Sequence, residues 1–83
     1  MRDPRWKILG QRVRQLRHER RLSQEDLAGL ASFHRNFIVL IEKGERNVTL
    51  RTLFALADAL EVHPSQLFEG CDFGGPVHDD PIP

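Results

Sequence analysis

The sequence has little of what secreted, membrane-spanning and catalytic proteins usually carry. Its 83 residues contain a single cysteine, Cys71, so no intrachain disulfide can form and no oxidising compartment is needed. No apolar run approaches the ~20 residues of a membrane-spanning helix, and the segment from Met1 to Lys7 is too polar for a signal peptide. These absences predict a cytoplasmic protein, and a length of 83 residues allows one domain at most.

The signatures of catalysis are also missing. The glycine pair Gly74–Gly75 stands in a segment of prolines and aspartates, not in a phosphate-binding loop, and no paired carboxylates stand on predicted rigid elements. Cys71 could be joined by His78, Asp79 and Asp80, but mixed ligands in a segment without regular structure make a poor metal site. We therefore predict no enzyme, no cofactor and no bound metal.

Positive charge is absent from residue 52 onwards. All 12 Lys and Arg lie in residues 1–51 with six of the 12 acidic residues, and the other six acidic residues lie in 52–83. The front of the chain therefore carries a charge of +6 and the rear −6, although the whole is neutral. A basic pole of this kind can meet phosphates, and ten of the cations are arginines, whose planar guanidinium suits phosphates and guanine edges. A solvated arginine-rich helix face followed by an acidic tail would give the same distribution.

What the sequence does contain is apolar residues at helical spacing along most of its length, which predicts an all-α fold. Ser23 and Thr49 are favourable N-caps, and Gly44 suits the position after a helix. The predicted helices cover residues 5–20, 24–31, 35–43, 50–60 and 64–68. The prediction is thus a five-helix domain over residues 5–69, followed by a disordered acidic Gly/Pro tail over residues 70–83.

The second and third predicted helices are short, and residues 32–34 connect them, which is the arrangement of a helix-turn-helix. The motif residues are Leu22-Ser23-Gln24-Glu25-Asp26-Leu27-Ala28, Ile38, Ile41-Glu42-Lys43-Gly44, Arg46-Asn47, Leu50-Arg51-Thr52-Leu53, Leu56-Ala57, Ala59-Leu60 and Leu67-Phe68. They span about residues 9–68 and resemble the Cro/repressor, or XRE, helix-turn-helix family. The segments 34–38 and 45–49 are especially similar to controller proteins of restriction–modification systems. The resemblance implies a five-helix, lambda-repressor-like DNA-binding domain.

The third predicted helix has a face that could enter the major groove of DNA. At ~100° per residue, this face carries Arg35, Asn36, Val39, Leu40 and Lys43. Arg35 stands at the helix start, from which arginine commonly reads guanine, and Asn36 could serve adenine or a phosphate. Val39 and Leu40 stand where the family usually has small or polar residues; they could pack on thymine methyl groups, bind a protein, or reflect a shifted helix. Ser32 stands in the turn where the family usually has glycine, so the tilt of this helix could differ.

The resemblance also implies contacts that hold the DNA backbone and the recognition helix. The residues expected to bind phosphates are Gln24, Lys43, Arg46, Asn47 and Thr52. Arg46 could instead enter the minor groove, and Ser23 is expected to be a helix cap rather than a ligand. Arg17 and Glu42 match the positions of an ion pair that fixes the recognition helix in this family.

The predicted helix over 50–60 is too apolar for one small core. Its apolar residues cover about 160° of the helix circumference, whereas a stripe that faces the core needs little over ~100°. The surplus predicts a homodimer, with interface residues Phe54, Leu56, Val62, Leu67 and Phe68. Two-fold symmetry would place two recognition helices ~34 Å apart on an inverted repeat. The alternative is that these residues complete the core of the monomer.

The sequence therefore predicts a sequence-specific DNA-binding transcription regulator that acts as a homodimer and controls its own gene. Double-stranded DNA is the expected partner, and RNA polymerase is a further candidate. A phage-type repressor is one alternative. An antitoxin-type interaction protein is another, because the acidic tail with Asp72, Asp79 and Asp80 could bind a partner protein.

Overall fold

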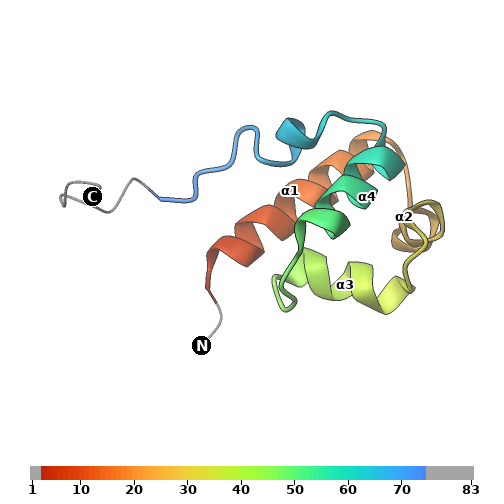
Figure 1. Ribbon diagram of the computed structural model, residues 1–83, viewed down its shortest axis with the longest axis horizontal. Coiled ribbons are helices and arrows are strands. Elements are labelled where there is room, and N and C mark those ends of the chain that lie inside the picture. The colour runs from red at the N-terminus through yellow and green to blue at the C-terminus, as the bar shows by residue number, and fades with distance from the viewer. Residues whose placement is uncertain (1–2, 75–83) are drawn as a thin grey trace.

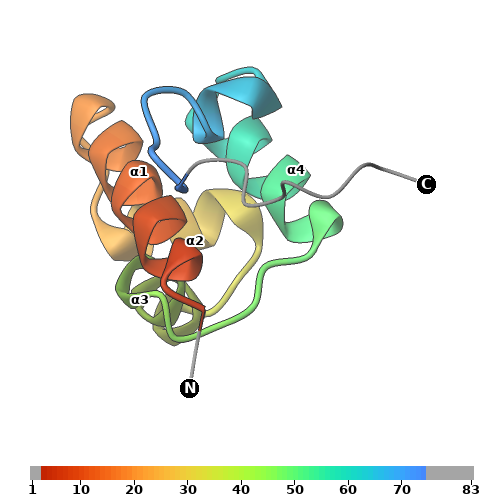
Figure 2. The ribbon, with the colours of Figure 1, turned by 90° about the vertical axis from the view of Figure 1, so that its left-hand side faces the viewer.

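The structure is a computed structural model, and it describes residues 3–74. The elements are α1 (Arg5–Glu19), α2 (Gln24–Ala31), α3 (Arg35–Lys43), α4 (Leu50–Leu60) and the 3₁₀ helix η1 (Pro64–Leu67). No strand occurs within residues 3–74, so the predicted all-α fold is confirmed for that part of the chain. α3 lies along one side of the bundle, below α1 and α4 (Figure 1), and the view from the side places it at the same lower end (Figure 2).

The predicted bounds of α2, α3 and α4 are confirmed, but the predicted fifth α-helix is wrong. The segment forms only a short 3₁₀ helix, with hydrogen bonds between residues three apart: Gln66 N–H donates to His63 O (2.9 Å) and Phe68 N–H to Ser65 O (3.1 Å). Pro64 has no N–H to donate, and the chain turns at Gly70 with a φ of +74°. The segment between these two residues is too short to continue as an α-helix.

A residue in the left-handed region lies at the end of α2, α3 and α4 and two residues after the end of α1, and three of these four residues are not glycine. They are Arg21 (φ 57°), Ser32 (φ 60°), Gly44 (φ 76°) and Glu61 (φ 56°). The next amide donates back into the last turn of the helix, as Phe33 N–H does to Ala28 O at 2.8 Å. Ser32 therefore adopts the left-handed conformation that glycine usually supplies at this position.

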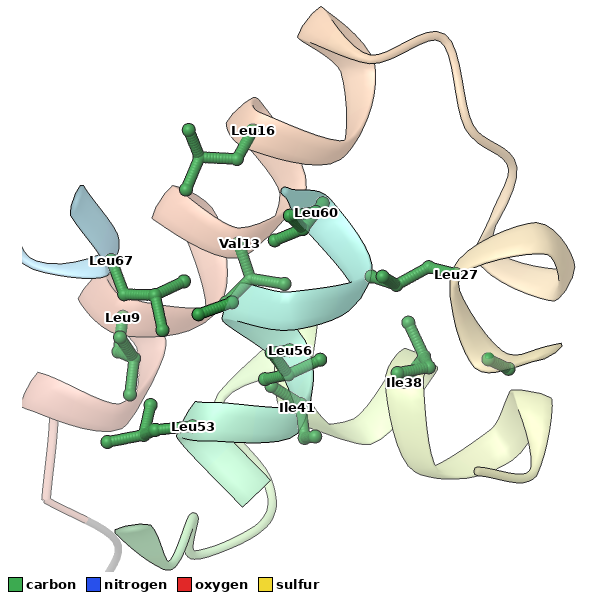
Figure 3. Close-up of a cluster of buried hydrophobic side chains, with 12 residues drawn as sticks. Leu9, Val13, Leu16, Leu27, Ile38, Ile41, Leu53, Leu56, Leu60 and Leu67 are labelled. Atoms are coloured by element: carbon green, nitrogen blue, oxygen red, sulfur yellow. The ribbon is translucent and has the colours of Figure 1, made fainter. Parts of the chain in front are cut away.

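The core gathers apolar side chains from every helix. Figure 3 shows Val13 of α1, Ile41 of α3 and Leu56 of α4 pointing toward one another, and all three are buried. Leu67 of η1 closes one end of this cluster and has no exposed surface. Burial of a leucine side chain stabilises a fold by about 1.5–3 kcal/mol, so this cluster fixes the relative positions of the four α-helices.

Two glycines allow α1 and α3 to approach closely. A Cβ atom on Gly10 would overlap the carbonyl oxygen of Ile41 and lie 2.7 Å from that of Glu42. A Cβ atom on Gly44 would lie 2.5 Å from the Cα of Lys7. Both clashes are with backbone or with atoms next to it, which cannot move aside cheaply. The position of α3 therefore depends on these two small residues.

Packing continues beyond the predicted end of the domain at residue 69. Phe73 packs against the core, and its ring centroid lies 6.0 Å from that of Phe68. Burial raises the pKa of the Cys71 thiol, whose Sγ lies 3.7 Å from Leu67 O. The rest of the predicted tail, residues 75–83 with His78, Asp79 and Asp80, lies outside the described residues. None of the helices described in residues 3–74 has the length and hydrophobicity of a membrane-spanning segment.

Candidate nucleic-acid interface

The N-terminus of α2 is fixed by a capping box. Ser23 Oγ accepts a hydrogen bond from Asp26 N–H (2.9 Å), and the Asp26 carboxylate accepts one from Ser23 N–H (3.0 Å). The bond from the Ser23 amide lowers the pKa of Asp26 below its usual value. Within residues 3–74, the amides of Gln24 and Glu25 have no acceptor. They remain at the positive end of the helix, where an anion is favoured.

A buried ion pair connects α1 to α3. Arg17 donates from Nε to Glu42 Oε2 (2.7 Å) and from Nη2 to Oε1 (3.0 Å), and the two side chains are only 8% and 4% exposed. Arg17 Nη1 also donates to Leu22 O at 2.8 Å, in the loop between α1 and α2. One guanidinium thus holds three segments together. The bidentate geometry fixes orientation as well as distance.

Gln24 extends this pair into a chain of hydrogen bonds that ends at the surface. Its Nε2 donates to Glu42 Oε1 (3.1 Å), and its Oε1 accepts a bond from Arg35 Nη2 (3.4 Å). The side chain expected to bind a phosphate is therefore engaged with two other side chains. Its second amide hydrogen and its backbone N–H remain for a ligand. The chain also orients the guanidinium of Arg35, the residue expected to read a base.

The exposed side of α3 matches the face derived from the sequence. Arg35, Asn36 and Lys43 are exposed, and Val39 and Leu40 are half-buried between them. Ile38, Ile41 and Glu42 are buried. The exposed and half-buried residues of α3 form one face, which we call the ridge: Arg35, Asn36, Val39, Leu40 and Lys43.

Phe37 of α3 packs against the edge of the core. It is half-buried at the flank of α3, with its ring centroid 4.9 Å from that of Phe33. The guanidinium of Arg46 lies 5.0 Å from the centroid of Phe37. A cation–π contact therefore attaches the loop after α3 to α3 itself, which spacing within one helix could not indicate.

A hollow lies on each side of the ridge. The first, of about 470 Å³, is polar and lies between α1, the start of α2 and α3; Arg14, Gln24, Arg35, Val39 and Lys43 are among its lining residues. The second, of about 450 Å³, is more apolar and lies on the opposite flank; Phe33, Asn36, Phe37, Leu40 and Arg46 are among its lining residues.

Three of the remaining candidates for phosphate contacts are accessible, and one is not. Lys43, Arg46 and Asn47 are exposed around the end of α3. Thr52 is only 8% exposed, and its hydroxyl accepts a bond from Thr49 Oγ1 at 3.1 Å. The expectation that Thr52 binds phosphate is corrected, because its side chain completes the cap of α4.

The residues expected at a subunit interface separate into two groups. Phe54 and Phe68 are 53% and 45% exposed, and Val62 is half-buried. Leu56 and Leu67 have no exposed surface, so the expectation that they contact a second subunit is corrected: they complete the core of the protomer. Leu50, which was not among the expected interface residues, is 69% exposed one turn before Phe54.

Arg12 of α1 and Arg20, which directly follows α1, have structural roles that the sequence did not indicate. Arg12 Nε donates to Gln66 O (2.7 Å), and Arg20 Nη2 donates to Glu61 O (2.9 Å). The acceptors are backbone carbonyls that follow α4 or belong to η1, and their positions depend on the tertiary fold. Part of the basic front therefore stabilises the protein and is not free for a ligand.

Comparisons with known proteins identify relatives along most of the chain. The family described as "Helix-turn-helix domain" matches residues 8–69. Control protein C.SmaI of Serratia marcescens is 47% identical over 60 residues, which are 72% of this chain and 71% of that protein. The restriction-modification controller protein C.AhdI from Aeromonas hydrophila superposes with a TM-score of 0.75 at 43% identity, over 76% of this chain and 96% of that one. The controller C.Esp1396I, in a structure of its tetramer with its natural 35-base-pair operator, gives a TM-score of 0.72 at 31% identity, over 77% of this chain and 84% of that one.

Proposed function

The chain belongs to the helix-turn-helix domain family, and from that membership we propose that it is a sequence-specific, DNA-binding transcription regulator of the controller type. The observation that carries the proposal is the ridge on α3. Its five residues combine cations, an amide and apolar groups on one accessible helix face, at the element that reads bases in this motif. C.SmaI is named a control protein and C.AhdI a restriction-modification controller protein, which favours the controller type.

Base recognition is assigned to Arg35, Asn36, Val39 and Leu40. Arg35 is exposed at the start of α3 and is oriented by Gln24, so it can present its planar fork to guanine O6 and N7. Asn36 follows it and can pair with adenine. Val39 and Leu40 are half-buried on the ridge between Asn36 and Lys43, and we assign them to thymine methyl groups.

Contacts to the DNA backbone are assigned to groups around this ridge. Gln24 would bind a phosphate through its backbone N–H and its remaining amide hydrogen, and Lys43, Arg46 and Asn47 would bind phosphates at the other end of α3. Such contacts position the protein on the duplex and carry no sequence information. The DNA-binding unit would therefore consist of residues 5–69, with residues 70–74 packed on it.

The proposed regulator acts as a homodimer on an inverted repeat. Phe54, Phe68 and Leu50 expose large apolar side chains on α4 and after η1, and Val62 lies between these elements in the chain. Apolar surface of this kind is the usual core of a subunit interface. A two-fold axis beside α4 would place the two copies of α3 about one turn of DNA apart, ~34 Å. Control of its own gene follows if the operator lies upstream of that gene; a contact with RNA polymerase would be needed for activation.

The test is a titration of the protein onto duplex DNA from immediately upstream of its own gene, with a scrambled duplex as control. We expect tight, salt-dependent binding to the upstream duplex. The variant Arg35→Ala should lose about 1–3 kcal/mol of binding free energy on the upstream duplex and little on the scrambled duplex. Equal and weak binding of the wild-type protein to both duplexes would contradict the proposal.

A further inference from the structure

The polar hollow between α1, α2 and α3 has a wall that the helix-turn-helix itself does not provide. The Arg17–Glu42 ion pair lines it, together with Arg14 of α1, Gln24 at the start of α2, and Arg35 and Lys43 of α3. The wall from α1 is the side chain of Arg14, which is exposed and was not among the expected DNA ligands.

The charges around this hollow favour an anion. The Arg17–Glu42 pair adds no net charge, because the positive guanidinium and the negative carboxylate cancel. Arg14, Arg35 and Lys43 contribute three positive charges, and Glu25 contributes one negative charge. The unbonded amides of Gln24 and Glu25 add the positive end of α2.

The other cations of α1 are committed elsewhere or lie outside the hollow. Arg5 bonds to Asp3, Arg12 to Gln66 O, and Arg17 to Glu42. Lys7 does not line the hollow. Within the described part of the chain, Arg14 has no internal acceptor, so its guanidinium is free to bind a ligand there.

We infer that Arg14 is a ligand for a DNA phosphate, held in this hollow opposite the N-terminus of α2. The inference rests on the proposed function, since the phosphate is one that flanks the major groove when Arg35 contacts a base. Arg35 and Arg14 line the same hollow. A duplex whose base is bound by Arg35 would therefore bring a backbone phosphate close to Arg14. The DNA contact then includes a third helix, and Arg14 contributes affinity without sequence preference.

The test compares Arg14→Gln with a matched control, Arg20→Gln. Both variants remove one positive charge from the same end of the chain, but the Arg20 side chain is directed to Glu61 and does not line the hollow. Binding is measured at several salt concentrations on the upstream and the scrambled duplex. We expect Arg14→Gln to weaken binding to both duplexes by a common factor and to reduce the slope of log K against log salt by about 0.9 for each subunit bound. Arg20→Gln should leave the slope unchanged.

A duplex in which single phosphates are replaced by neutral methylphosphonates gives a second measurement. One such replacement in each half-site should weaken DNA binding by the wild-type protein and leave DNA binding by Arg14→Gln unchanged. Equal slopes for the two variants, or equal sensitivity to every replacement, would overturn the inference while leaving the proposed function intact. A third outcome is that the wild-type protein prefers neither duplex, while Arg14→Gln still reduces the slope of log K against log salt. That outcome would contradict the operator proposal and support the phosphate contact. Wild-type protein without salt-dependent binding would overturn both.

Discussion

The two sides of the bundle are attached to α1 by different kinds of contact. On the side of α3, Arg17 bonds to a single carboxylate, Glu42, and backbones touch at Gly10 and Gly44. On the side of α4 and η1, apolar burial is combined with bonds from Arg12 and Arg20 to backbone carbonyls. Every residue type supplies a carbonyl, but only Asp or Glu supplies a carboxylate. The DNA side should therefore be more sensitive to single substitutions than the opposite side.

The largest expected effect is on the DNA side. Glu42→Ala leaves the buried guanidinium of Arg17 without its partner, which should lower the free energy of unfolding by about 3–5 kcal/mol. Thermal or urea unfolding measures this loss. Replacing both partners, as in Arg17→Met with Glu42→Leu, should recover much of the stability, because no unpaired charge remains buried. A melting temperature of Glu42→Ala equal to that of the wild-type protein would show that the pair is unimportant.

The next effect separates core from surface within α4. Leu56→Ala should cost about 2–5 kcal/mol of folding stability, since Leu56 has no exposed surface. Phe54→Ala should change the stability of the protomer by less than about 0.5 kcal/mol, because its ring is 53% exposed, but it should weaken the dimer. Sedimentation of both variants measures association. A wild-type monomer at concentrations on the order of tens of micromolar would remove the dimer proposal.

The smallest expected effect concerns the turn between α2 and α3. Ser32 has a φ of 60°, a conformation that costs a residue with a Cβ about 1 kcal/mol relative to glycine. Ser32→Gly should therefore raise the melting temperature by a few degrees, partly offset by the greater freedom of glycine in the unfolded chain. DNA affinity should not change, because the turn already has the geometry that glycine would take. A lower melting temperature would show that the serine side chain stabilises the turn.

The sequence was sufficient for features that depend on one helix at a time. The caps at Ser23 and Thr49, the bounds of α2 to α4 and the exposed face of α3 all follow from local patterns. The resemblance to a family added the Arg17–Glu42 positions, which the structure brings together. These features need no knowledge of how helices pack.

Features that depend on the path of the chain were not predictable in this way. The apolar pattern of α4 could not separate Leu56, which faces the core, from Phe54, which faces outward. The carbonyls bound by Arg12 and Arg20 are brought to α1 only when the segment after α4 folds back. The engagement of Gln24 with Glu42 likewise requires α2 and α3 to be in place.

The bonds from α1 in both directions have a consequence for the spacing of half-sites. Arg17 links α1 to α3, and Arg12 links α1 to η1, which precedes the exposed Phe68. In the proposed dimer, the separation between the two recognition helices would be set by rigid contacts with little adjustment. One inserted base pair adds about 3.4 Å and a tenth of a helical turn between half-sites. Such an operator should lose simultaneous contact at both half-sites, even though every base that the protein reads is still present.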